Sequence, residues 1–245
     1  MIRNLKIVFF LSVAIILLIW SATAMYTEVL RDLPNRTIAY WDCIGEIHSE
    51  KNWQTQNIVL SGLIRYQPYS IEINTDLGRL YDWQALNDDA WSNDAKSARK
   101  NASHYYRKVT KLKPAWANGW LNLAKSKSIN QEIDSELLQS LDNAYRFGSN
   151  QTGIQTQLIW LSLGMWESLD ATLKNKTQYL IRDLLHINKK TTFIITAAFR
   201  FSWVDNLRKL TSNPAILKRI SFLENNPDVL EKTFTQDQPK QVCSL

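Results

Sequence analysis

The sequence contains few glycines and prolines, 7 and 6 among its 245 residues. An all-β protein needs many tight turns, and these two residue types form a large share of them. Their scarcity therefore favours a helical protein. Hydrophobic residues make up 45% of the chain and charged residues 21%, which suffices for one or two domains with a buried core.

Histidine is also rare, and the usual sequence marks of an enzyme are missing. The three histidines, His48, His104 and His186, stand in neither an H-E-x-x-H motif nor a Cys/His cluster with metal-ligand spacing. No glycine-bearing calcium loop follows Asp88 and Asp89, and the chain has no G-x-S-x-G, P-loop or dinucleotide motif. We therefore predict no catalytic site, no metal and no cofactor. The alternative, an enzyme of unknown type, would need an acid or base with a perturbed pKa in a cleft.

Long basic runs are absent too. The net charge is +6, but lysine and arginine are spread along the chain, and no run is longer than Lys189-Lys190. This pattern predicts no nucleic-acid partner. A basic domain beside a membrane could contact anionic lipid or an anionic polymer, although solubility alone also explains the excess charge.

One long hydrophobic run is present at the N-terminus. Residues 7–25 carry no charge and would cover about 28 Å as a helix, close to the thickness of the hydrocarbon layer. Trp20 and Tyr26 could anchor this helix at the far interface. We predict a retained anchor at residues 7–26, and the alternative is a signal peptide cleaved at Ala22-Thr23-Ala24.

The basic residues Arg3 and Lys6 favour a cytoplasmic tail at residues 1–6. Either an anchor or a signal peptide exports the rest of the chain. For a bacterial cell, this predicts a single-pass inner-membrane protein with its bulk in the periplasm. In that oxidising compartment Cys43 and Cys243, which lie near opposite ends of the exported part, could form a disulfide, although two cysteines make no framework.

The remaining chain reads as helices. We expect a juxtamembrane link at residues 27–45 that Pro34 interrupts, a helical domain at 46–225 and a disordered tail at 226–245. Within the domain, apolar residues recur at three- and four-residue spacing over several segments. The expected helices from Asp94 onward are 94–113, one after Pro114, 134–147, 153–169, 172–187, 191–210 and 214–224.

Three segments repeat one short pattern: 74–81 (NTDLGRLY), 120–124 (WLNLA) and 160–164 (WLSLG). Pro68 and Pro114 each lie nine residues before the leucine of the segment that follows, Leu77 and Leu123. The pattern resembles the tetratricopeptide repeat, which has W-x2-L-G-x2-Y, then A-x3-F, then P. In that family the small residue lets two helices touch, and the proline ends the second helix.

The match to this family is partial. The residues that fit its first helix are Leu77, Gly78, Tyr81, Trp120, Leu123, Ala124, Trp160, Leu163 and Gly164. Ala102, Tyr106 and Pro114 fit its second helix, whereas Lys127 and Glu167 replace the expected tyrosine. The segments also lie further apart than one standard repeat. We therefore expect an all-α fold with two to three degenerate tetratricopeptide-like hairpins over residues 50–190, an α-solenoid fragment.

The whole layout resembles the VpsP family of bacterial polysaccharide-biosynthesis proteins. Those proteins have a short N-terminal tail, one membrane anchor and a small repeat-like helical domain. The segments 114–120 (PAWANGW) and 144–148 (AYRFG) carry the resemblance. It implies a role in making or exporting an extracellular polysaccharide, with synthesis or export proteins as partners, and it supplies no catalytic residues.

Repeat hairpins usually bind partners along the concave face that their first helices form. Projecting the repeat onto this chain places Arg79, Asp82, Asn118, Asn122 and Lys125 on that face, where a merely hydrated surface is the alternative. A second hypothesis is a glycan-binding module, because tryptophan stacks on sugar rings. The tryptophans near turns between helices are Trp83, Trp91 and Trp116, whereas Trp120 and Trp160 are expected to pack in the core.

Overall fold

The computed structural model describes residues 2–47, 49–87, 89 and 92–236. These residues form twelve α-helices and one short 3₁₀ helix, with no strand among them, which confirms the predicted all-α class. The elements are α1 (Ile2–Ile44), α2 (Glu50–Tyr66), α3 (Ile71–Asn87), α4 (Asn93–Leu112), α5 (Ala117–Ile129), α6 (Ser135–Gly148), α7 (Thr152–Gly164), η1 (Trp166–Ser168), α8 (Ala171–Leu184), α9 (Asn188–Arg200), α10 (Val204–Leu210), α11 (Pro214–Glu224) and α12 (Pro227–Gln236).

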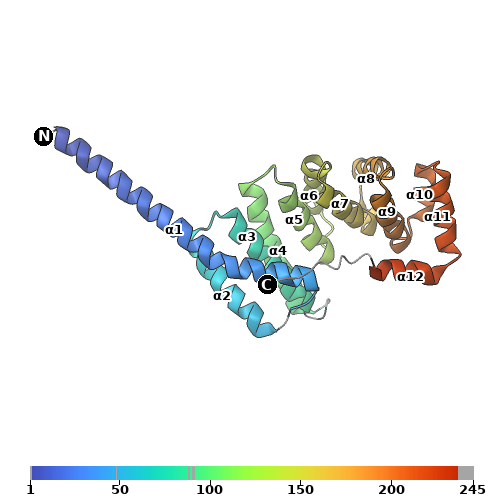
Figure 1. The fold of residues 1–245 in the computed structure, drawn as a ribbon, viewed down its shortest axis with the longest axis horizontal. Coiled ribbons are helices and arrows are strands. Elements are labelled where there is room, and N and C mark those ends of the chain that lie inside the picture. The colour runs from blue at the N-terminus through green and yellow to red at the C-terminus, as the bar shows by residue number, and fades with distance from the viewer. Residues whose placement is uncertain (1, 48, 88, 90–91, 237–245) are drawn as a thin grey trace.

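The first helix, α1, is much longer than the predicted anchor. Its N-terminal part extends away from the other helices (Figure 1), and α1 is the one helix in the described residues long and apolar enough to span a membrane. The predicted interruption at Pro34 is wrong, because α1 continues through this residue to Ile44. Proline removes one backbone hydrogen bond. Burial of Thr27, Ile38 and Trp41 on both sides of Pro34 stabilises the helix and offsets that loss.

Polar contacts join the C-terminal part of α1 to α3. The Arg31 Nε atom lies 2.6 Å from the Asp76 carboxylate, whose side chain is buried. Further along both helices, Asp42 pairs with Arg79 and accepts a 2.7 Å hydrogen bond from the indole Nε1 of Trp83. The end of α1 is therefore part of the folded domain, without a loop between the apolar segment and the domain.

The following helices pack as hairpins that stand side by side, with α3 against α4, α5 against α6 and α7 against α8 (Figure 1). Gly78 of α3 faces the ring of Tyr106 of α4. A Cβ atom at Gly78 would lie 2.4 Å from that ring, so glycine is needed for this approach. The contact joins two residues that fit the first-helix and second-helix positions of the repeat pattern.

Two helix ends use a left-handed residue that is not glycine. Gln131 follows α5 with a φ of 60°, and Ser202 follows α9 with a φ of 54°. At the second site, the Trp203 N–H donates to the Ala198 carbonyl and the Ser202 N–H to the Phe199 carbonyl. This is a Schellman end, in which glycine is the usual residue. It splits the predicted helix at 191–210 into α9 and α10.

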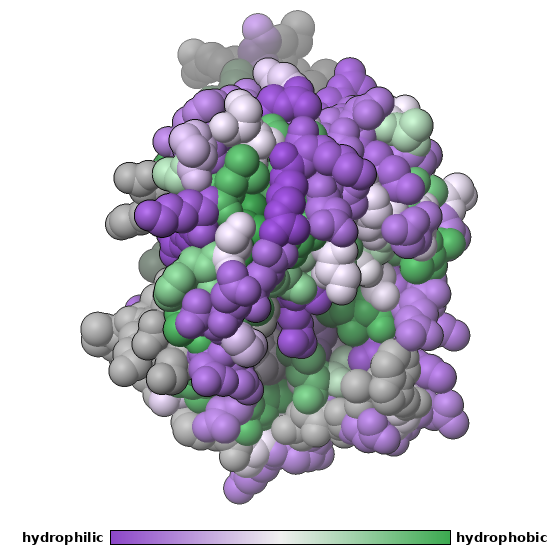
Figure 2. Space-filling view, turned by 90° about the vertical axis from the view of Figure 1, so that its right-hand side faces the viewer, coloured by the Kyte–Doolittle hydropathy of each residue, from purple (hydrophilic) through white to green (hydrophobic). Residues whose placement is uncertain are grey.

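The C-terminal end of the row is closed by α10, α11 and α12. Apolar residues of α11 complete a core that begins in α5. Figure 2 shows this end of the molecule covered mainly by hydrophilic residues, with smaller hydrophobic patches between them. A polar outer face is typical of the last unit of a helical solenoid. The tail predicted to be disordered from residue 226 begins with α12, and residues 237–245 lie outside the described part.

Candidate functional site: a groove along the first helices

A cavity of about 560 Å³ lies between α1, α3, α4, α5 and α7, and we call it the polar section. Its lining combines charged, amide and aromatic side chains, which come mostly from α3 and α5. The lining residues are Asp42, Arg79, Asp82, Trp83, Leu86, Tyr106, Asn122, Lys125 and Gln157. This composition can bind polar groups of an extended ligand.

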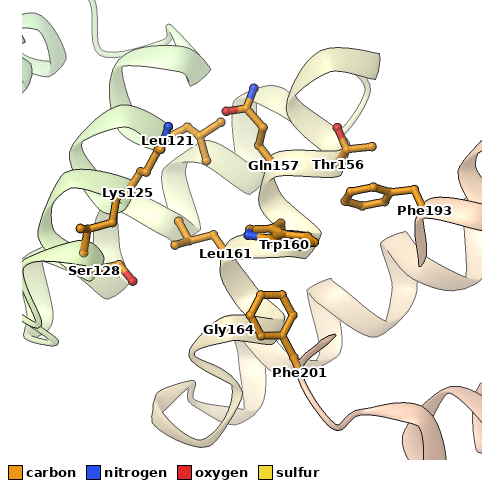
Figure 3. A pocket seen from close by; sticks show the side chains of 11 residues that line it. Leu121, Lys125, Ser128, Thr156, Gln157, Trp160, Leu161, Gly164, Phe193 and Phe201 are labelled. Carbon is orange, nitrogen blue, oxygen red and sulfur yellow. The ribbon is translucent and has the colours of Figure 1, made fainter. Parts of the chain in front are cut away.

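A second cavity of about 440 Å³ lies between α5, α7 and α9, and we call it the aromatic section. Figure 3 shows Trp160 at its centre, with Phe193 and Phe201 beside the indole and Lys125 on the facing helix. The ring centroids of Trp160 and Phe201 are 4.8 Å apart in an edge-to-face arrangement, and Phe193 lies 6.1 Å away. Three aromatic rings at this spacing form an apolar surface that can receive a large apolar side chain.

The two sections share Lys125 and Gln157, so they lie next to each other, and we call them together the groove. A third cavity of about 450 Å³ continues from the aromatic section through Ser128, Gly164 and Phe201. Both left-handed residues, Gln131 and Ser202, line this third cavity. The groove therefore follows the first helices of successive hairpins and is open to an extended ligand.

Trp160 was expected in the core, and that expectation is wrong, because its side chain is 41% exposed. The left-handed backbone of Ser202 reverses the chain directly after Phe201, which lies against Gly164 of α7. A Cβ at Gly164 would lie 3.2 Å from the Phe201 ring, so the missing side chain leaves room for the aromatic cluster.

Asp82 is the carboxylate of the polar section that two hydroxyl groups bind. The Tyr106 hydroxyl donates a 2.8 Å hydrogen bond to it, and the Ser126 hydroxyl donates another at 3.2 Å. Burial of the carboxylate raises the pKa of Asp82 to about 6, although these hydrogen bonds and the charge of Lys125 act in the opposite direction. The charge of the groove therefore changes in a mildly acidic environment.

The two cations of the groove differ in their freedom to bind a ligand. Arg79 pairs with Asp42 and also lies 3.5 Å from Asp76, so its guanidinium is engaged in attaching α1. Lys125 is exposed and makes no ion pair within the described part of the chain. Because it belongs to both sections, its ammonium is the cation best placed to bind an anionic group of a ligand.

A charged network joins α5 to α4 and to the start of α6. The ammonium of Lys127, whose side chain is 3% exposed, lies 2.8 Å from the carboxylates of both Asp134 and Glu136. Arg107 of α4 binds the same Glu136 through two nitrogens. The Arg107 guanidinium is the main cause that lowers the pKa of Glu136 to about 2. This network replaces the tyrosine that the repeat pattern expects at Lys127.

The predicted binding residues come together only in part. Arg79, Asp82, Asn122 and Lys125 line the polar section, whereas Asn118 lines neither section. Sequence reasoning missed Asp42 and the aromatic group of Trp160, Phe193 and Phe201. The pairing of Asp42 with Arg79 depends on the helical continuation of α1, and the aromatic group depends on the packing of α7 against α9. Neither arrangement is signalled by a local sequence pattern.

The predicted tryptophan surface is not assembled in the groove. Trp83 lines the polar section, but its indole N–H is already donated to Asp42. Trp116 lies at the start of α5 beside Lys113 and lines neither section of the groove. Trp91 lies outside the described residues. Cys243 lies outside them as well, so the disulfide between Cys43 and Cys243 stays a prediction.

Comparisons with known proteins give no relative: no family model, no curated protein and no solved structure matches this chain. Within the described residues, no group of three or more His, Cys, Asp or Glu side chains could hold a metal ion.

Replacing Asp82 by asparagine tests the electrostatics of the polar section. Because the folded pKa of Asp82 lies above its unfolded value of about 4, its contribution to stability is present below pH 4 and is lost as pH rises through about 6. We expect the free energy of unfolding of Asp82→Asn to rise by about 2 kcal/mol relative to that of the wild type as the pH increases from 4 to 7. Thermal unfolding at a series of pH values measures this gain.

The control is Asp205→Asn, which removes a carboxylate whose side chain is 89% exposed. Its unfolding temperature should follow the wild-type curve over the same pH range. Parallel curves for Asp82→Asn and the wild type would contradict the raised pKa of Asp82.

Proposed function

We propose that this chain is a membrane-anchored scaffold that binds an extended segment of a partner protein in its groove. The observation that carries the proposal is that the polar and aromatic sections adjoin, since Lys125 and Gln157 line both of them. A segment lying there would place an apolar side chain against Trp160 and an acidic group near Lys125. Exposed aromatic residues in a pocket are the usual centres of binding energy in protein interfaces.

The setting that we propose is exopolysaccharide biosynthesis or export at the bacterial inner membrane, with the groove in the periplasm. It rests on the apolar segment of α1, on Arg3 and Lys6 before it, and on the resemblance to the VpsP family. The partner would then be a synthesis or export protein. The positions of Lys125 and Trp160 favour a polypeptide with mixed acidic and apolar character.

The second candidate is a glycan-binding module that guides the growing polymer. The observation in its favour is that Trp83, an amphipathic ring, lies in the polar section beside hydrogen-bonding groups. The separation of Trp83 from Trp116 counts against it, because a polymer held by several tryptophans needs their rings along one path.

The decisive experiment is a pull-down of the full-length protein from its native host in mild detergent, with mass spectrometry of the bound proteins. The test variant is Asn122→Ala with Lys125→Ala, which removes an amide and the unpaired cation from the polar section. We expect recovery of polysaccharide synthesis or export proteins with the wild type and its loss with this variant.

A matched control carries Lys100→Ala and Asn101→Ala. These residues have the same side-chain types, are exposed on α4 and do not line the groove. The control should recover the partner as the wild type does. Equal loss with both variants, or no loss with either, contradicts binding in the groove, and recovery of polymer without protein would favour the glycan-binding module.

A further inference from the structure

We infer that the connection between α2 and α3 is a second membrane contact, which inserts Tyr66 and Tyr69 into the headgroup layer of the bilayer that α1 spans. This inference rests on the proposed anchoring by α1. The surface lies at the N-terminal end of α3, at the other end of this helix from the loop that leads to α4. The occupant that we propose is lipid, and the observation behind it is the position of this connection along α1.

Contacts between α1 and α3 fix that position. The two helices run in the same direction, because Arg31 pairs with Asp76 and the later residue Asp42 pairs with Arg79 and Trp83. Arg31 lies about 7.5 Å beyond Tyr26 along α1, and Asp76 lies about 7.5 Å beyond Ile71, the first residue of α3, at the usual helical rise.

The start of α3 is therefore level with Tyr26, the residue at the end of the apolar segment. The contacts of Asp42 with Trp83 and with Arg79 place the start of α3 about 6 Å and about 12 Å further from the membrane. All three contacts put the α2–α3 connection within about 12 Å of the level of Tyr26, in the interfacial layer. Thr27, the residue after Tyr26, is already buried by the domain, so no spacer separates the domain from the bilayer.

The chemistry of the connection suits this layer. Tyr66, the last residue of α2, and Tyr69, which follows Pro68, are 78% and 79% exposed, so they present two aromatic rings at this connection. Tyrosine is enriched at membrane interfaces because its ring is apolar and its hydroxyl remains hydrated. The nearby charges are one of each sign, Arg65 and Glu72, both exposed, so contact depends on the rings rather than on attraction to anionic lipid.

The test uses the full-length protein in liposomes of phosphatidylethanolamine and phosphatidylglycerol that contain a lipid with a nitroxide on its headgroup. A clickable amino acid carrying the fluorophore NBD replaces one tyrosine at a time. Position 69 tests the inference, position 26 reports whether α1 is in the membrane, and position 179 is the control. Tyr179 is 72% exposed on α8, in a later hairpin.

We expect the nitroxide to quench the fluorophore at position 69 as strongly as at position 26, and to leave position 179 unquenched. Quenching at 26 without quenching at 69 overturns the inference while the anchor stands, and it would indicate that another protein or water covers the connection. No quenching at 26 shows that the proposed anchoring itself fails. Equal quenching at 69 and 179 means that the label partitions by itself, which also overturns the inference.

Discussion

Replacing Trp160 by alanine should weaken partner binding by about 30-fold while the fold stays intact, as expected for the central aromatic residue of an interface. The indole is the centre of the aromatic section, and it contacts Phe193 and Phe201 at its rim. Because the side chain is 41% exposed, its removal opens the groove wall rather than a closed core cavity. Titration of the partner recovered in the pull-down, against immobilised full-length protein, measures the change in affinity.

The matched control is Phe222→Ala on α11, which removes an aromatic residue that is 52% exposed and lies outside the groove. The affinity of this variant should equal that of the wild type. Thermal unfolding of both variants separates lost binding from lost folding. A Trp160→Ala protein that folds and binds its partner with unchanged affinity would exclude the aromatic section from the interface.

Replacing Gly78 by alanine should destabilise the protein by about 2–3 kcal/mol through overpacking. The new Cβ would lie 2.4 Å from the Tyr106 ring. That ring cannot move aside easily, since it is fully buried and its hydroxyl is hydrogen-bonded to Asp82. For a domain of this size we expect the unfolding temperature to fall by about 4–10 °C, measured by circular dichroism in detergent.

Gly62→Ala is the control, and we expect it to change the stability in the opposite direction. Gly62 lies inside α2, and a Cβ there would meet nothing within 4 Å. Alanine at that position should stabilise the protein by about 0.5–1 kcal/mol, because glycine is a poor helix former. Similar unfolding temperatures for the two variants would show that the approach of α3 to α4 is looser than the structure has it.

The sequence predicts the hairpin packing well where a local pattern determines it. The short segment around Leu77, Gly78 and Tyr81 combines large residues with one small residue, and a close helix contact needs that combination. The sequence also predicts the first residue of a helix well where a capping residue or a proline marks it. Asp134 accepts a hydrogen bond from the backbone at the start of α6, and Pro214 begins α11. These features involve residues close together in the sequence.

The groove was harder to predict because its walls come from distant parts of the chain. Repeat geometry places Arg79, Asp82, Asn122 and Lys125 on one face, and all four line the polar section. The aromatic section brings Trp160 of α7 against Phe193 and Phe201, which lie more than thirty residues later, and no local pattern around Trp160 indicates that contact.

The continuation of α1 through Pro34 was missed for a different reason. A proline in a helical pattern predicts a break on local grounds, because it removes a hydrogen bond. Whether the helix continues depends on the packing around it, and here Ile38 and Trp41 are fully buried beyond the proline. Tertiary packing therefore overrides the local signal at this position.

The unbroken course of α1, with its polar contacts to α3, has a mechanical consequence. With the apolar half of α1 in a bilayer, the groove cannot swivel on a tether and turns only when the whole helix turns about its own axis. Encounters with a partner in the same membrane then become a two-dimensional search in which the height of the groove is constant. A pull on a bound segment would tilt the helix in the lipid, so load on the partner is transmitted directly to the membrane.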